Sequence, residues 1–166
     1  MNYNITAREN VFSKEMCEQL VSFMGEGLEA TVGPPSENQE KAPSEIRKSN
    51  VTFLPEILNN YDVYRVLMDL VYEVNKEHYN FHLHMPETIQ LTKYDSQNQG
   101  HYAPHTDSSD VQQNAYNLPR KLSVVVQLSC PDSYEGGDLI FPDAETGCSE
   151  AIKPQGTAII FPSYVL

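Results

Sequence analysis

Long apolar runs are absent from this sequence of 166 residues, since no stretch approaches the ~20 apolar residues of a membrane-spanning helix. The opening residues, MNYNITAREN, also lack the apolar core of a secretory signal peptide. Basic residues are few, with 11 Lys and Arg against 23 Asp and Glu and a formal net charge of −12. Because nucleic-acid binding depends on clustered Lys and Arg, we expect no nucleic-acid partner and no membrane partner.

Cysteine is equally scarce. Cys17, Cys130 and Cys148 are an odd number, lie far apart and form no CxxC motif. This usage favours reduced thiols in a cytoplasmic protein, and a single incidental disulfide is the alternative. The length and the 40% share of hydrophobic residues fit one globular domain over residues 1–166.

Hydrophobic periodicity predicts helices first and strands later. Helical spacing covers residues 11–29, with Ser13 as the N-cap and with Gly25 and Gly27 expected to weaken and end the helix. A second helix is predicted from Tyr61 to Tyr79. Residues 31–46 are polar and rich in proline, which predicts a mobile loop. Short strands are predicted at residues 47–55, 88–94, 121–129, 138–141 and 157–162.

This order of elements predicts an α+β fold, with an antiparallel sandwich or jelly roll that carries helices on one side. Residues 1–80 would form a helical support region that includes the loop at 31–46. Residues 81–166 would form the sheet core.

The segment 94–107, YDSQNQGHYAPHTD, contains the most informative residues. His105 and Asp107 are two positions apart, and residues at this spacing point to the same face of an extended strand. An imidazole and a carboxylate on one face supply two of the three ligands of a 2-His-1-carboxylate iron site, which leaves positions open for a cosubstrate and O2. An HxD pattern also occurs by chance in many proteins, so its neighbours decide the interpretation.

An ordered set of neighbours surrounds this pair. Tyr94, Gly100 and Tyr102 precede His105 and Asp107. The residues that follow are a valine-rich strand ending in Gln127-Leu128-Ser129, the turn Tyr134-Glu135-Gly136-Gly137-Asp138-Leu139, and Gly156-Thr157-Ala158-Ile159-Ile160-Phe161-Pro162-Ser163. Together these residues resemble the 2-oxoglutarate- and Fe(II)-dependent dioxygenases, specifically the prolyl 4-hydroxylase-like branch with microbial and phage members. The resemblance covers about residues 88–166.

The resemblance implies a double-stranded β-helix (jelly-roll, cupin-like) core with N-terminal supporting helices, and Fe(II) held inside it by His105 and Asp107. It implies an enzyme that hydroxylates a substrate carbon while 2-oxoglutarate and O2 are consumed and succinate is released. Ascorbate is a further candidate cofactor. The first expected substrate is a prolyl residue in a peptide or protein, and the second is a free amino acid or small metabolite. The resemblance implies no particular oligomeric state.

Two further positions match residues that line the 2-oxoglutarate pocket in this family. Tyr94 corresponds to a pocket tyrosine, and Gln127 occupies a position where relatives often carry a tyrosine directed at the 2-oxoglutarate carboxylate. The alternative hypotheses are that Tyr94 is a packed aromatic residue and that Gln127 lies on a solvated sheet face.

Two parts of the family pattern are missing from the sequence. Relatives carry a second histidine, the third metal ligand, shortly after a segment like Phe161-Pro162-Ser163, and further on an Arg or Lys that pairs with 2-oxoglutarate. By this spacing the histidine would directly follow Leu166, so we expect a longer protein that adds the last strands of the jelly roll. Two rival hypotheses remain: a non-enzymatic jelly-roll module that binds a metal or ligand without a complete iron site, and a zinc- or other metal-dependent cupin enzyme.

Overall fold

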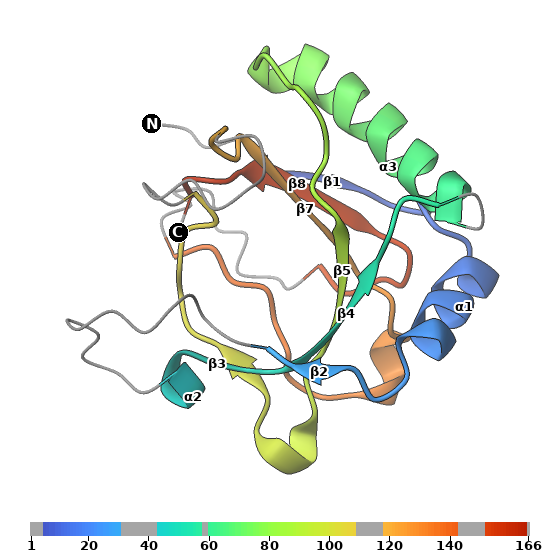
Figure 1. Ribbon diagram of the computed structural model, residues 1–166, viewed down its shortest axis with the longest axis vertical. Helices are drawn as coiled ribbons and strands as arrows, with labels where there is room; N and C mark the ends of the chain where they lie inside the picture. The colour runs from blue at the N-terminus through green and yellow to red at the C-terminus, as the bar shows by residue number, and fades with distance from the viewer. Residues whose placement is uncertain (1–4, 31–42, 58–59, 109–117, 143–151, 166) are drawn as a thin grey trace.

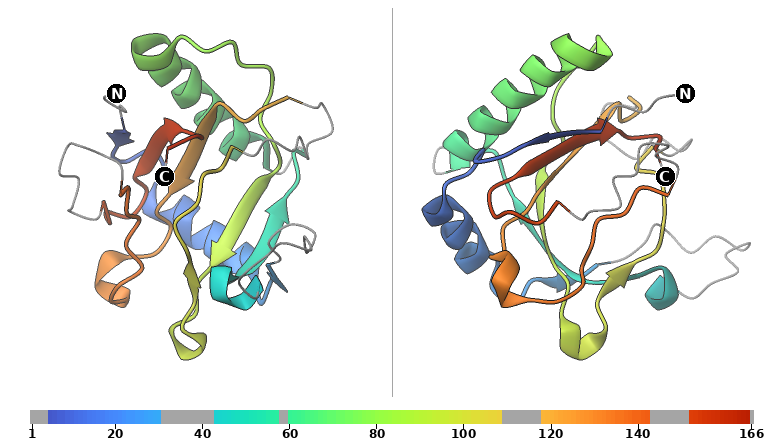
Figure 2. Two further views of the ribbon diagram at one scale, coloured as in Figure 1. Left: turned by 90° about the vertical axis from the view of Figure 1, so that its left-hand side faces the viewer. Right: turned by 180° about the vertical axis from the view of Figure 1, so that it is seen from behind.

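The longer helices, α1 (Lys14–Met24) and α3 (Tyr61–Val74), lie on the outside of a set of short antiparallel strands (Figures 1 and 2). The computed structural model describes residues 5–30, 43–57, 60–108, 118–142 and 152–165. The helices are α1 (Lys14–Met24), α2 (Pro43–Ile46) and α3 (Tyr61–Val74), with a π-helical turn at Asn75–Tyr79 and 3-10 turns at Ser96–Asn98 and Pro131–Ser133. Within these ranges, no helix is both long and apolar enough to cross a membrane.

The strands form three small antiparallel sheets. They are β1 (Thr6–Arg8), β2 (Leu28–Glu29), β3 (Arg47–Lys48), β4 (Asn50–Leu54), β5 (Ile89–Lys93), β6 (His101–Tyr102), β7 (Leu122–Val126) and β8 (Ala158–Pro162). The sheet orders are β1-β8-β7, β2-β4-β5 and β3-β6. The predicted α+β class is therefore confirmed, whereas the strand assignment stops short of a jelly roll.

Helix α1 begins and ends where elementary capping rules place it. The Ser13 side chain accepts a hydrogen bond of 3.2 Å from the backbone N–H of Met16, which satisfies one of the free donors of the first turn. The helix stops at Gly25, whose φ of 57° is easy only for a residue without a side chain. The prediction that Gly25 and Gly27 end the helix within 11–29 is therefore confirmed at Gly25, and β2 follows.

Helix α3 follows the predicted segment closely, but its last part widens into the π-helical turn Asn75–Tyr79. The Asn75 side chain explains this ending. Its Nδ2 donates to the Phe81 carbonyl and its Oδ1 accepts from the Phe81 N–H, both at 2.9 Å. These two bonds satisfy backbone groups just past the turn, where Asn80 takes the left-handed conformation that asparagine tolerates.

The sheet β1-β8-β7 has one face toward α3 and one toward the candidate site. Ala158 and Ile160 are fully buried and pack with Val74 of α3, and Val124 and Val126 add to this cluster. Because side chains alternate along a strand, Ser123, which is paired with Phe161, faces the other way. The polar residues at this end of β7 therefore point away from the helix-facing core.

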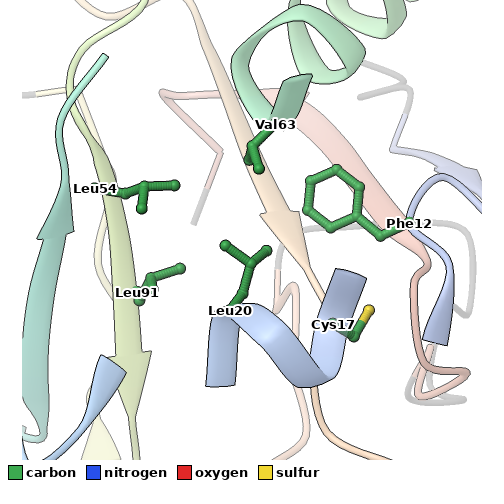
Figure 3. Packing of buried hydrophobic residues seen from close by; sticks show 6 residues of the cluster. All are labelled: Phe12, Cys17, Leu20, Leu54, Val63 and Leu91. Atoms are coloured by element: carbon green, nitrogen blue, oxygen red, sulfur yellow. The ribbon is translucent and has the colours of Figure 1, made fainter. Parts of the chain in front are cut away.

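The sheet β2-β4-β5 is covered by the two long helices. Leu54 of β4 and Leu91 of β5 converge with Leu20 of α1 and Val63 of α3, as Figure 3 shows together with Phe12 and Cys17. Burial of such apolar side chains is the main favourable free-energy term of the fold. It fixes β5, which leads into the segment 94–107.

The third sheet has only two short strands, but it carries two residues of the candidate site. β3 and β6 are antiparallel, with Arg47 opposite Tyr102 and Lys48 opposite His101. Residues on directly opposed positions lie on the same face of a sheet, so Arg47 and Tyr102 are neighbours. Hence the N-terminal half of the chain contributes directly to the site.

Several further predictions can be compared with the structure. The strands predicted at 47–55, 88–94, 121–129 and 157–162 are confirmed in shortened form. The strand predicted at 138–141 is wrong, since Asp138–Phe141 has no ladder pairing. Residues 31–42 of the predicted loop lie outside the described residues, and 43–46 form α2. Within residues 1–80 the structure adds β1 and β2 to the predicted strand at 47–55, which is divided into β3 and β4.

Candidate metal centre

His105 and Asp107 face each other just after β6. The distance between His105 Nε2 and Asp107 Oδ1 is 3.3 Å, and the two side chains are 35% and 30% exposed. The spacing argument assumed an extended strand, but residues 103–108 are irregular and bent. The expectation of a strand was therefore wrong here, although the two side chains do point to one place.

The His105 ring is oriented by its other nitrogen. Nδ1 lies 2.8 Å from the Ala103 carbonyl oxygen, and because a carbonyl can only accept, Nδ1 carries the proton of this bond. In the neutral ring Nε2 is then an acceptor, and it faces a carboxylate oxygen that is also an acceptor. Two acceptors at this distance need a cation between them, which is either a proton on Nε2 or a bound metal ion.

The pKa shifts of His105 and Asp107 also favour a positive charge between the two side chains. The hydrogen bond with Asp107 raises the pKa of His105, against the opposing effect of burial. Burial raises the pKa of the Asp107 carboxyl, but hydrogen bonds from His105 and Ser123 and the charges of His105 and Arg120 outweigh it, so the net shift is downward. The site therefore holds a carboxylate beside an imidazole nitrogen, which are typical ligands of Fe(II).

Ser123 of β7 and Ser163, which follows β8, form hydrogen bonds that hold Asp107 and the residue after it in place. Ser123 hydrogen-bonds to the Asp107 side chain, and the Ser123 and Ser163 hydroxyls are 3.0 Å apart. The Ser108 N–H donates to the Ser163 carbonyl at 2.8 Å, which ties the HxD segment to the end of β8. Such partners of a ligand fix its orientation and contribute to metal affinity.

Aromatic rings cover the other side of His105. The Tyr102 ring stacks on the imidazole, with 3.6 Å between centroids and 18° between planes. The Arg47 guanidinium carbon lies 4.7 Å from the centroid of the Tyr102 ring. Burial raises the pKa of both Tyr94 and Tyr102, while the positive charge of Arg47 acts in the opposite direction on each. Tyr94 is also coupled electrostatically to Asp107, so it lies close to the metal pair.

The position of Gln127 follows from its backbone hydrogen bonds. Its backbone continues the ladder between β7 and β8, donating to the Thr157 carbonyl at 3.0 Å and accepting from the Gly156 N–H at 2.7 Å. Gln127 lies two residues beyond Val125 and four beyond Ser123. Because side chains alternate along a strand, this spacing assigns Gln127 to the same face as Ser123, the face that carries the site. The roles of Tyr94 and Gln127 in holding 2-oxoglutarate stay predictions.

Three charged residues near the pair were missed from the sequence. Arg120 Nη1 donates to the Asp107 carbonyl at 3.3 Å, and Glu87 receives two hydrogen bonds from the same guanidinium, at 2.9 and 2.7 Å. Arg47 is the third. Their sequence neighbourhoods carry no signal for this chemistry, because each contact joins distant parts of the chain.

The residues present fit two of the three protein ligands of a facial iron site. Across the part of the chain that the structure describes, no group of three or more His, Cys, Asp and Glu side chains is arranged to hold a metal ion. The ring nitrogens of His101 lie 2.9 and 3.2 Å from the carbonyl oxygens of Gln99 and Glu45, respectively.

Comparison with known proteins adds the enzyme class. Residues 89–166 match the model of the 2OG-Fe(II) oxygenase superfamily, and this segment contains both metal-ligand candidates. Neither the curated proteins nor the solved structures gave a match.

This match supports the 2OG-Fe(II) oxygenase superfamily for residues 89–166. The protein is a 2-oxoglutarate- and Fe(II)-dependent dioxygenase, and it uses Fe(II), 2-oxoglutarate and O2.

Proposed function

We propose that this dioxygenase hydroxylates a prolyl residue in a peptide or protein, with decarboxylation of 2-oxoglutarate to succinate. The observation that carries the iron chemistry is the His105 Nε2–Asp107 Oδ1 pair at 3.3 Å, with Nδ1 already committed to Ala103. The prolyl substrate is supported by the ordered set of residues from Tyr94 to Ser163 that resembles the prolyl 4-hydroxylase-like branch.

The proposal gives each described residue of the site a task. His105 Nε2 and Asp107 Oδ1 would hold Fe(II), which with 2-oxoglutarate and O2 supplies the oxidising power for hydroxylation. The Ala103 carbonyl keeps the proton on His105 Nδ1, and the Tyr102 ring keeps the imidazole plane fixed. Tyr94 and Gln127 would bind 2-oxoglutarate through their hydroxyl and amide groups.

The exposure of the site favours an extended substrate over a small enclosed one. The side chains of Arg120 and Glu87 are 51% and 42% exposed, and 47% of Tyr94 is accessible. Small metabolites are usually bound in pockets that cover most of their surface. Partly exposed donors and acceptors beside the metal pair are suited to the backbone carbonyl and N–H groups of a peptide. A free amino acid or small metabolite is the second substrate to test.

Two finer features belong to the same proposal. Ascorbate would serve as a reductant that returns oxidised iron to Fe(II). A cytoplasmic location is supported by Cys17 and Cys130, which are both free thiols, as is usual in a reducing compartment.

The test is turnover by the full chain with Fe(II), 2-oxoglutarate, O2 and proline-containing peptides, with succinate measured beside the peptide mass. We expect succinate in step with the addition of one oxygen atom to a proline. Asp107→Asn should lower both products by more than about 100-fold, because a neutral amide is a poor iron ligand. Adding ascorbate should prolong turnover.

The controls separate the substrate from the chemistry. Thr106→Ser changes the residue between the two ligands without altering either, so it should keep most of the activity. Succinate formation without peptide modification would contradict the prolyl substrate and direct attention to free amino acids. Equal turnover by the Asp107→Asn variant would contradict the assignment of the metal ligands.

A further inference from the structure

Arg47 differs from the other arginines in having no carboxylate partner among the described residues. Arg8 pairs with Glu77 at 2.7 Å, and Arg120 pairs with Glu87 at 2.7 Å. Arg65 lies 3.5 Å from Asp62 and 3.8 Å from Asp69. In a chain with 23 acidic and 11 basic residues, a guanidinium without an acidic partner is unusual, and this one lies beside the metal pair.

The Arg47 side chain is held in place by contacts that leave part of its donor set free. Its Nε donates to the Ser49 hydroxyl at 2.9 Å, and the guanidinium lies over the Tyr102 ring at 4.7 Å. Tyr102 in turn stacks on His105 at 3.6 Å. A hydrogen bond with the Tyr102 side chain engages the guanidinium as well. A guanidinium has five N–H donors, so these two hydrogen bonds leave further donors at a fixed position, one ring away from a metal-ligand candidate.

The charge of Arg47 acts on the site itself. It opposes the upward pKa shifts of Tyr94 and Tyr102, and it also acts on His105. The Asp107 carboxylate of the site is already engaged by His105 and Ser123. A carboxylate that enters the site with a ligand therefore meets a pre-positioned cation that no described acidic group neutralises.

We propose that Arg47 binds a carboxylate of the substrate, so that the enzyme selects peptides with an acidic residue next to the hydroxylated one. This inference rests on the proposed peptide hydroxylation. The planar guanidinium fork matches a carboxylate with two parallel hydrogen bonds, and stacking on Tyr102 reduces the conformational entropy lost on binding. The net charge of −12 opposes the binding of an acidic peptide, so a preference for glutamate would have to come from a local cation such as Arg47.

The test compares peptides that differ only in charge. One peptide has glutamate on both sides of a single proline, a second has glutamine there, and a third has lysine. Their affinities are measured without O2 by fluorescence anisotropy, with the full chain loaded with Fe(II) and 2-oxoglutarate. Turnover is then measured separately with O2. We expect the glutamate peptide to bind about 10-fold more tightly than the glutamine peptide, the size of one charge-assisted contact.

Variants of Arg47 assign the preference to this residue. Arg47→Gln should abolish the difference between the glutamate and glutamine peptides, and Arg47→Glu should favour the lysine peptide. Arg47→Lys keeps the charge without the fork, so it should retain a reduced preference for glutamate. Lys48→Gln removes the same charge from the neighbouring exposed position and should leave the preference unchanged. Circular dichroism checks that each variant is folded.

The results that would overturn the inference are distinct from failure of the proposed function. Equal affinity for glutamate and glutamine peptides in the native protein, or an unchanged preference in the Arg47→Gln variant, overturns it. A raised KM for 2-oxoglutarate in that variant, with peptide selectivity intact, would assign Arg47 to the cosubstrate carboxylate instead. If the Arg47-dependent preference appears in binding but no proline is hydroxylated, the proposed function fails and the carboxylate site stands.

Discussion

The Tyr102 ring lies flat on the His105 imidazole, with 3.6 Å between the centroids and 18° between the planes. Together with the 2.8 Å bond from Nδ1 to the Ala103 carbonyl, this contact leaves the imidazole a single orientation, in which Nε2 faces Asp107. The orientation of the metal ligand is therefore set before any metal binds.

This stack predicts different effects for two substitutions. Tyr102→Ala removes the ring that restrains the imidazole, and we expect iron affinity to fall about 10-fold, the lower end of the range for residues that orient a ligand. Tyr102→Phe keeps the ring, so its iron affinity should stay close to that of the native protein. Titration with Fe(II) under anaerobic conditions measures both. Equal losses in the two variants would mean that the hydroxyl, and not the stacked ring, supports the site.

The ligand pair could be predicted from the sequence, whereas its surroundings could not. Residue type and spacing suffice for His105 and Asp107, since an HxD pattern within an ordered set of neighbours is local information. Arg47 and Tyr102 become neighbours only because β3 pairs with β6. Glu87 and Arg120 likewise meet across 33 positions of the chain. Such long-range pairs depend on sheet register, which the sequence pattern does not specify.

In the fold as well, elements set by neighbouring residues could be predicted from the sequence, whereas strands that depend on a distant partner could not. The start of α1 at Ser13 and its end at Gly25 follow from capping and backbone freedom. The strand predicted at 138–141 failed because a strand needs a partner for its backbone hydrogen bonds, and Asp138–Phe141 pairs with no other strand among the described residues. β1 was missed since Thr6–Arg8 is short and gains its stability from β8.

The core between the helices and β4-β5 predicts a large stability effect. Leu91 is 5% exposed and packs in the cluster of Figure 3, so Leu91→Ala should reduce the free energy of unfolding by about 2–5 kcal/mol. Val21 is 50% exposed on α1, and Val21→Ala should change it by less than about 0.5 kcal/mol. Urea unfolding followed by circular dichroism measures both values. A loss below about 1 kcal/mol for Leu91→Ala would contradict the packing described for this cluster.

The two described cysteines are predicted to differ in reactivity. Cys17 is fully buried, and burial raises the pKa of its thiol, whereas Cys130 is exposed. A raised pKa means less thiolate at a given pH, and the thiolate is the nucleophile, so Cys17 should react slowly with iodoacetamide. Brief alkylation near neutral pH followed by peptide mass spectrometry should label Cys130 in the native protein, and Cys17 only after denaturation. Rapid labelling of Cys17 in the folded state would show that α1 opens readily.

The Arg120–Glu87 pair is predicted to matter for turnover more than for stability. Glu87 accepts hydrogen bonds from Nε and Nη2 of Arg120, and this arrangement directs Nη1 toward the Asp107 carbonyl. Glu87→Gln loses the charge and one of the two acceptor sites. Because both side chains are about half exposed, the cost in unfolding free energy should be at most about 1 kcal/mol.

Turnover should respond more strongly to this change, because Arg120 contacts the backbone of a metal-ligand candidate. We expect kcat/KM for succinate formation to fall about 10-fold in Glu87→Gln, since small displacements of positioned groups are costly in catalysis. Asp69→Asn is the matched control, because it weakens the exposed Arg65–Asp69 pair within α3. It should change unfolding free energy by a similar amount without affecting turnover. If both variants lose activity equally, the effect follows stability and Arg120 has no positioning role; if neither does, the contact with Asp107 is dispensable.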